Sequence, residues 1–155
     1  MKRLNLLLAA LMLSVAAVSC SDDDSASASV NADPTAVINT MKSGTWRITS
    51  FTDDGNNETN HFTSFNFTFD ENNVLTATDG TNTINGLWTV TNDDSSDDDN
   101  GSSNDIDFNI VFSSPDMFTD LTDDWEIQER SGVRIKLRDV SGGNGGTDYL
   151  VFEKN

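Results

Sequence analysis

Residues 65–78 read FNFTFDENNVLTAT and hold the clearest structural pattern in the chain. Apolar and polar side chains alternate on both sides of a polar centre, and a period of two is typical of a strand with one buried face. A three-residue loop, Glu71-Asn72-Asn73, places Phe69 opposite Leu75 and directs both apolar sets to the same side. The stretch therefore predicts an antiparallel hairpin with one hydrophobic face.

The same alternation recurs along the 155-residue chain. Seven stretches show it, and the apolar run from Tyr149 to Phe152 brings the count to eight. An eight-stranded meander that closes on itself leaves no exposed sheet edge. We therefore predict an all-β fold for residues 34–155, an eight-stranded antiparallel up-and-down barrel. The apolar sets are Trp46 and Ile48; Phe65, Phe67 and Phe69; Leu75 and Ala77; Ile84, Trp88 and Val90; Ile106, Phe108, Ile110 and Phe112; Trp125 and Ile127; Val133, Ile135 and Leu137; and Tyr149 to Phe152.

Two more turns predict how neighbouring strands pair. Asp79-Gly80 as a two-residue turn sets Leu75 opposite Ile84. Arg130-Ser131-Gly132, with Gly132 in the left-handed region, sets Ile127 opposite Ile135. The second register also pairs opposite charges on the outer face, Glu126 with Lys136 and Asp124 with Arg138.

Two short helices are expected outside the strands. The first runs from Pro34 to Lys42, because Asp33 is a favourable N-cap and proline suits the first helical position. The second is a single turn from Pro115 to Thr119, with Ser114 as its cap.

The first nineteen residues have the layout of an export signal. Lys2 and Arg3 precede an apolar stretch, residues 4–18, that is too short to span a bilayer as a helix. Small residues then lead to Cys20, an arrangement that resembles the lipobox of bacterial lipoproteins. The resemblance implies cleavage before Cys20 and acylation of that cysteine, which would anchor the protein to outer-membrane lipid. The alternative is a plain secretory signal followed by an ordinary thiol. Cys20 is the only cysteine, so no disulfide can form within the chain.

Residues 20–33 are predicted to be an acidic, flexible tether, because they are small and polar. Its first part, Ser21, Asp22, Asp23 and Asp24, resembles the acidic tag that sends lipoproteins of Bacteroidota to the cell exterior. The alternative for these four residues is the solvated start of a linker.

Charge excludes some partners. The chain has 26 acidic and 9 basic residues, a net charge of −17, which becomes −19 when Lys2 and Arg3 leave with the signal. Nucleic acid and anionic membrane surfaces are therefore not expected as partners.

Neither an enzyme nor a resident metal or cofactor is expected. His61 is the only histidine, and no metal-ligand, nucleophile or phosphate-binding motif is present. The loop from Asn92 to Asp105 carries six aspartates, and aligning Gly101 with the EF-hand glycine puts Ser96, Asp98, Asn100 and Asp107 at calcium-ligand positions. The first and last of these fit poorly, so we interpret the loop as a solvated acidic tip.

A resemblance to a known family rests on three short segments. A helix followed by Gly44-Thr45-Trp46 looks like the start of a lipocalin-like domain, and Gly86-Leu87-Trp88 and residues 121–125 look like later strands of lipocalin-like lipoproteins of Bacteroidota. The resemblance implies a calyx for an apolar small molecule. It also implies a basic residue covering the Trp of the first strand, for which Arg138 and Lys154 both remain candidates.

Loop lengths indicate where a ligand would enter. The loops after the first, third, fifth and seventh strands share one rim, and three of them are long, so this rim is the expected mouth. Phe51, Phe62, Met117 and Phe118 lie beside it and are the predicted ligand-lining residues. Two functions follow. One is a surface lipoprotein that binds an apolar or amphipathic small molecule; the other is a structural or adhesive lipoprotein with a filled barrel that contacts protein or glycan through its loops.

Overall fold

The computed structural model describes residues 33–92, 106–140 and 146–155. In chain order its elements are α1 (Pro34–Lys42), β1 (Thr45–Asp53), β2 (Asn56–Asn57), the 3₁₀ helix η1 (Thr59–His61), β3 (Asn66–Phe69), β4 (Val74–Thr78), β5 (Thr83–Asn92), β6 (Ile106–Val111), α2 (Asp116–Thr119), β7 (Asp123–Arg130), β8 (Arg134–Asp139) and β9 (Asp148–Lys154). Neither helix in these ranges is long and apolar enough to cross a membrane.

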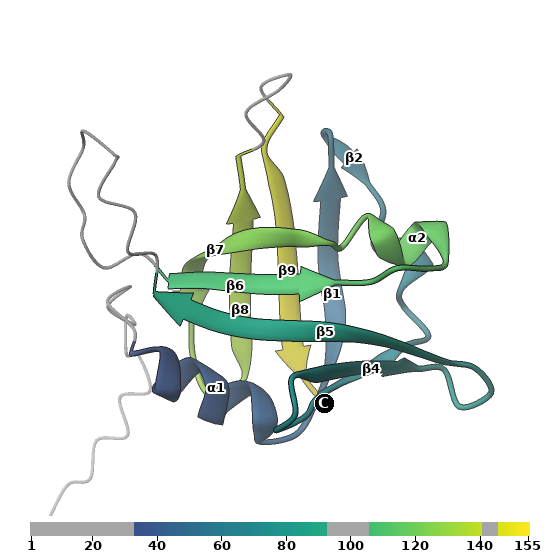
Figure 1. The fold of residues 1–155 in the computed structure, drawn as a ribbon. Helices are drawn as coiled ribbons and strands as arrows, with labels where there is room; N and C mark the ends of the chain where they lie inside the picture. Colours follow the sequence, from purple (N-terminus) through teal and green to yellow (C-terminus); the bar gives the residue numbers. More distant parts are fainter. Residues whose placement is uncertain (1–32, 93–105, 141–145) are drawn as a thin grey trace, which may run out of the picture.

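The strands form one antiparallel meander that closes into a barrel (Figure 1). Each strand from β3 to β8 pairs with the next, β3 also pairs with β1, and β1 pairs with β9 to close the ring. The two-residue β2 pairs antiparallel with the last two residues of β1. The predicted eight-stranded up-and-down barrel with one short N-terminal helix is therefore confirmed.

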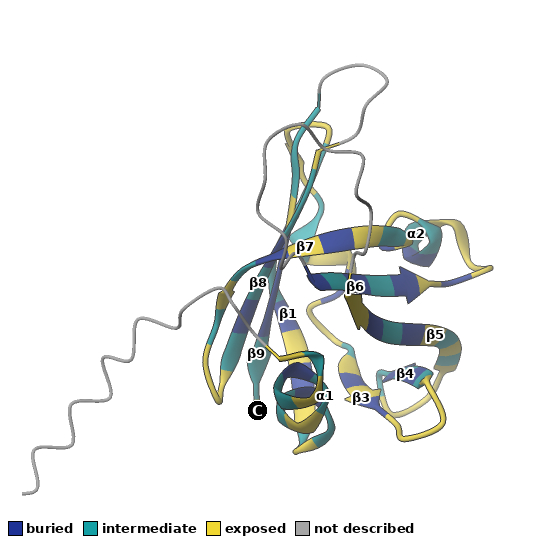
Figure 2. Ribbon diagram, turned by 60° about the vertical axis from the view of Figure 1, so that its left-hand side comes forward, coloured by how far each residue is buried: buried dark blue, intermediate teal, exposed yellow. Residues whose placement is uncertain are grey.

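The inside of the barrel holds the predicted apolar faces. Buried residues alternate with more exposed ones along most strands (Figure 2), as expected where one face of each strand meets the core. Within the described ranges no polar or charged residue is buried. Val133 departs from the prediction, since it lies in the loop before β8 and is exposed.

Helix α1 closes one end of the barrel and has the predicted bounds. The Asp33 carboxylate accepts a hydrogen bond from the Thr35 amide, which confirms the predicted N-cap. Val37 and Met41 are fully buried on the inner side of the helix. The indole of Trp46 donates to the Met41 carbonyl at 2.8 Å, so the start of β1 is tied to the end of α1.

The register between β3 and β4 is as predicted, whereas that between β4 and β5 is not. Phe69 pairs with Leu75 across the Glu71–Asn73 loop. On the other side of β4, Leu75 pairs with Gly86, because the connection is a four-residue loop, 79–82. The Asp79 carboxylate accepts from the amides of Thr81 and Asn82 and stabilises this longer loop. The shift is two residues, so the apolar side chains keep their face.

The hairpin of β7 and β8 also differs from the prediction. Ile127 pairs with Leu137, and a bulge between Ile127 and Glu129 absorbs one residue. Gly132 does not adopt the left-handed conformation. As a result, the outer face pairs Glu126 with Arg138, and the predicted pairs of Glu126 with Lys136 and Asp124 with Arg138 are wrong.

Helix α2 begins one residue later than predicted, and Ser114 does not cap it. Its N-cap position is taken by Pro115, and no side chain caps the helix. The amide of Phe118 bonds instead to the Pro115 carbonyl at 2.7 Å. The Ser114 hydroxyl stands one residue too early for the capping bond.

Candidate functional site

The rim opposite α1 was the predicted ligand mouth, and its loops bring the four predicted lining residues together. Phe51 comes from the end of β1, Phe62 follows η1, and Met117 and Phe118 lie on α2. Phe51, Phe62 and Phe118 are buried, and Met117 is partly buried against the core. All four lie at this rim, and each of the three rings is packed among other side chains.

Phe118 is the centre of this packing. Its ring lies 5.4 Å from Phe62, 5.1 Å from Phe65 and 5.0 Å from Phe112 between centroids, in edge-to-face arrangements. Phe51 packs against Phe62 at 5.7 Å. Helix α2 therefore places an aromatic plug at this end of the barrel.

Ring contacts continue from the plug to the other end. Phe67 links Phe118 to Phe152, and Phe69 links Phe152 to Trp88 and Phe108. All nine phenylalanines of the chain belong to the core or pack against it. An eight-stranded barrel has room for side chains or for one small ligand, and this aromatic column runs through its interior.

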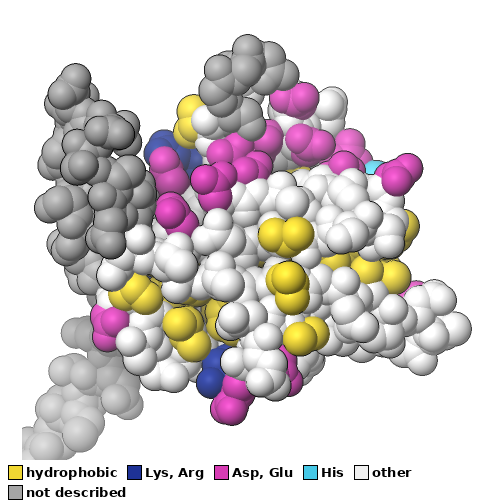
Figure 3. Space-filling view, in the orientation of Figure 1, with side chains coloured by type: hydrophobic (Ala, Val, Ile, Leu, Met, Phe, Trp, Pro, Cys, Tyr) yellow, Lys and Arg dark blue, Asp and Glu magenta, His cyan; other side chains and the backbone are white. Residues whose placement is uncertain are grey.

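Outside the plug, the same rim carries two groups of three aspartates. Asp53 and Asp54 meet Asp148, and Asp123 and Asp124 meet Asp139, with one carboxylate oxygen of each residue within 4.8 Å of the others in its group. These are the oxygen ligands that Ca²⁺ prefers, so each group could approach a divalent cation. Acidic side chains gather along the upper edge of the molecule in Figure 3.

Crowding changes the acidity of one aspartate in each group. Partial burial raises the pKa of Asp123 to about 6, and the neighbouring carboxylates of Asp139 and Asp124 add to the rise. Burial also raises the pKa of Asp53, followed by repulsion from Asp148 and Asp120. Burial and neighbouring carboxylates thus both disfavour ionisation of Asp53 and Asp123.

His61 lies near this rim but does not join either group. Its Nδ1 lies 3.2 Å from a Glu58 carboxylate oxygen, and its side chain is about half exposed. Among the described residues, no group of three potential ligands includes it.

A pocket that the sequence did not suggest lies at the α1 end. It has a volume of about 210 Å³, and its walls are Ile38 and Lys42 of α1, residues 88–91 of β5, and Asp70, Glu71 and Asn73. The Lys42–Glu71 ion pair stands at its edge, 3.2 Å between charged atoms. It is smaller than the roughly 300–1,000 Å³ of a typical small-molecule site.

Of the two candidate basic residues, Lys154 lies next to the first-strand Trp. Lys154 pairs with Trp46 in the β1–β9 register, and its ammonium donates to the Ser43 hydroxyl at 2.9 Å. Arg138 is held elsewhere by Glu126.

Several predictions lie outside the described residues. They are the signal at 1–19, the tether at 20–33 except its last residue, the lipidation site Cys20, the tag Ser21 to Asp24, and the acidic loop at 93–105.

The fold and the rim together define a closed antiparallel β-barrel with an aromatic interior and an acidic end. No protein-family model matches the sequence. No curated protein matches it either. Among solved structures, the chain is similar to a DUF4847 family protein from Bacteroides vulgatus ATCC 8482, with 19% sequence identity, a TM-score of 0.49, and coverage of 77% of this chain and 97% of that one.

Proposed function

We propose that this protein is a lipid-anchored, non-enzymatic surface lipoprotein whose filled barrel is a rigid scaffold, and that its loops and outer surface contact protein or glycan. The observation that carries the proposal is the aromatic column, because the interior positions that would line a calyx are taken by the chain's own phenylalanines. This favours the scaffold over the apolar-ligand hypothesis, in which Phe51, Phe62, Met117 and Phe118 would line a cavity.

The proposed location rests on the amino-terminal sequence. An acylated Cys20 would hold the barrel at the outer membrane, and the acidic run Ser21 to Asp24 would direct it to the exterior. A tether of residues 20–33 reaches up to about 45 Å when extended, which leaves the acidic rim free to meet a partner. Lipocalin-like lipoproteins of Bacteroidota remain the family that the sequence resembles.

The interior is tested with an apolar probe. The wild-type barrel should bind neither xenon nor benzene with measurable affinity, whereas Phe118→Ala should open an apolar cavity and bind benzene. Calorimetry and benzene-induced chemical shift changes measure this, with Phe118→Leu as a control that leaves a smaller void. Saturable binding of an apolar molecule to the wild type, or its co-purification from the native host in native mass spectrometry, would contradict the filled scaffold.

The anchor is tested separately. Metabolic labelling with an alkyne fatty acid should mark the wild type and not Cys20→Ala. Replacing Asp22, Asp23 and Asp24 by Ala should retain the label but remove protease accessibility on intact cells. Label on the Cys20→Ala protein would refute the lipid anchor, and unchanged accessibility of the triple variant would refute the export tag.

A further inference from the structure

The outward positions of β3 to β6 differ from the rest of this acidic molecule. We call them the neutral face. They are every second residue, counted from the first, of the ranges 66–68, 74–78, 83–91 and 107–111. They comprise six threonines, three asparagines, three aliphatic residues and one charged residue, Asp107. In a chain with a net charge of −17, four adjacent strands thus present a surface almost without charge.

An apolar row crosses the middle of the neutral face. The register places Val74 beside Leu87 and Leu87 beside Val111, on three neighbouring strands. Leu87 is 55% exposed and Val111 is 45% exposed, whereas Val74 is partly buried. Figure 3 shows hydrophobic side chains aligned over this part of the barrel, with uncharged side chains around them. Adjacent exposed apolar side chains with a polar surround occur on protein-binding surfaces.

Polar side chains beside the row form hydrogen bonds between neighbouring strands. The Thr76 hydroxyl donates to the Asn85 side-chain oxygen at 3.2 Å, and the Asn109 side-chain amide donates to the Thr91 hydroxyl at 3.4 Å. These short side chains, held by the strands, form a regular surface that can pack against a second sheet, as inner faces do in sheet-on-sheet packing.

We propose that the neutral face is a self-association surface, on which a second copy of this chain docks through a two-fold axis near Leu87. Like charges repel when two copies of a highly acidic protein approach, and the repulsion is smallest where the facing surfaces carry no charge. In a two-fold contact the same patch lies on both sides, so the neutral face meets itself and the apolar row is covered. The inference does not depend on the lipid anchor or on the filled interior.

Other occupants fit the neutral face less well. The outward positions of these strands include one charged residue, Asp107, so they offer a charged partner little to pair with. A glycan usually stacks on an exposed aromatic ring, and on these four strands all Phe and Trp residues face the core. Four strands spaced by about 4.8 Å give a contact roughly 20 Å wide, which suits a weak, reversible dimer.

The test is sedimentation velocity of the Cys20→Ala chain without the signal residues 1–19, over a concentration range of about 5 µM to 1 mM. The protein with an unchanged neutral face should show a monomer–dimer equilibrium. Its association constant should rise between about 0.05 and 0.5 M NaCl, because salt screens the repulsion between the acidic surfaces outside the neutral face. Leu87→Asp should lower the association constant by about tenfold or more. Val133→Asp is the matched control, since Val133 is 62% exposed and lies off the neutral face, and it should leave the constant within about twofold.

A second variant separates association from folding. Leu87→Thr adds no charge and introduces threonine, the commonest residue of the neutral face. It should weaken the dimer but leave the melting temperature of the monomer, measured in dilute solution, unchanged. Wild-type protein that stays monomeric over the whole range, or an equal loss in Val133→Asp and Leu87→Asp, would overturn the proposal, as would association that weakens with salt.

Discussion

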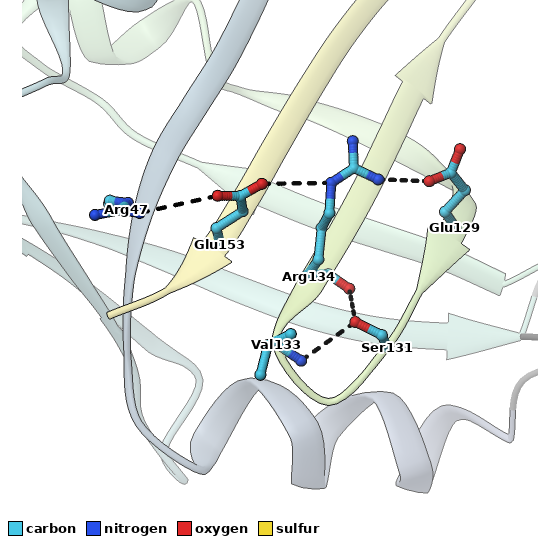
Figure 4. A network of polar contacts seen from close by, with 6 residues as sticks. All are labelled: Arg47, Glu129, Ser131, Val133, Arg134 and Glu153. Atoms are coloured by element: carbon cyan, nitrogen blue, oxygen red, sulfur yellow. Dashed lines mark hydrogen bonds and ion pairs between the residues drawn. The ribbon is translucent and has the colours of Figure 1, made fainter. Parts of the chain in front are cut away.

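The barrel has two outer halves that differ in chemistry although their inner faces are alike. Opposite the neutral face, the outward residues of β7, β8, β9 and β1 form what we call the charged face. Here Arg134 lies between Glu129 and Glu153, and Glu153 also approaches Arg47 at 3.9 Å (Figure 4). Arg138 pairs with Glu126 on the same side.

The comparison shows that folding constrains the inner positions of the strands but not the outer ones. Inner positions in both halves are apolar, because every strand must bury one face in the barrel. Outer positions have no such requirement, and one half fills them with paired ions whereas the other fills them with threonine, asparagine and an apolar row. Since either solution satisfies the fold, the choice points to what each face meets, and this is why the neutral face carries the inference of self-association.

The largest expected effect is a loss of stability on a substitution inside the neutral half, and it tests how closely that half is packed. Gly86, on the inner side of β5, has no room for a side chain: an added Cβ would lie 2.6 Å from the Val111 carbonyl oxygen and 2.6 Å from the Phe112 ring. Gly86→Ala should lower the free energy of unfolding by about 1–3 kcal/mol, since a backbone atom cannot move away easily. Urea denaturation measures it.

Gly44→Ala is the matched control for this substitution. Its added Cβ would also lie at 2.6 Å, but from the end of the flexible Lys154 side chain. We expect a loss below about 1 kcal/mol, because the lysine can move. Equal losses for the two variants would show that the close approach at Gly86 does not matter for the barrel.

The second prediction concerns the ion pairs of the charged face. Arg134→Met should remove both contacts, to Glu129 and to Glu153, and lower the free energy of unfolding by about 0.5–1 kcal/mol at low salt. The loss should shrink when NaCl screens the charges. Arg47→Met, which removes one longer contact, should cost less, and a salt-independent loss in Arg134→Met would mean that packing of the side chain dominates.

The third prediction concerns pH at the acidic rim, where the barrel holds like charges together. The pKa of Asp123 is raised from 3.8 to about 6, so the folded protein binds more protons than the unfolded chain between these values. The contribution of Asp123 to the free energy of unfolding is therefore fully present below about pH 4, where its carboxyl is protonated. It is lost as the pH rises through about 6.

Asp123→Asn should therefore stabilise the protein relative to wild type above about pH 6 and show little advantage below pH 4. The gain should stay below about 1 kcal/mol, because the carboxylate is only half-buried and solvent screens it. Melting curves from pH 4 to 8 measure this difference. A gain that is constant across the range would contradict the raised pKa.

The smallest expected effect is on the neutral face itself. Leu87→Thr should change the free energy of unfolding of the monomer by no more than about 0.5 kcal/mol, since the side chain is exposed and threonine suits a strand. Dilute solution is required for the measurement, so that dimerisation does not contribute. A loss above about 1 kcal/mol would show that Leu87 supports the fold and would weaken the case for a binding role.

The sequence by itself determined the strands and their inner faces. Alternation such as that of Phe65, Phe67 and Phe69 is a local property, because successive side chains of any strand point to opposite sides. The bounds of α1 were equally local, since Asp33 and Pro34 specify the first turn without help from the rest of the chain. The number of strands followed from the count of apolar stretches, and the up-and-down order from the hairpin turns between several of them.

Only the tertiary structure decided which residues meet across the barrel. Asp53 and Asp148 belong to strands far apart in sequence, and their approach depends on closure through β1 and β9. The row from Val74 to Leu87 to Val111 exists because the 79–82 loop shifts β5 by two residues relative to the predicted register. Whether Phe118 lines a cavity or fills it depends on rings supplied by several distant elements. Local patterns specify the face that a side chain takes, whereas register, closure and packing density depend on contacts between distant residues.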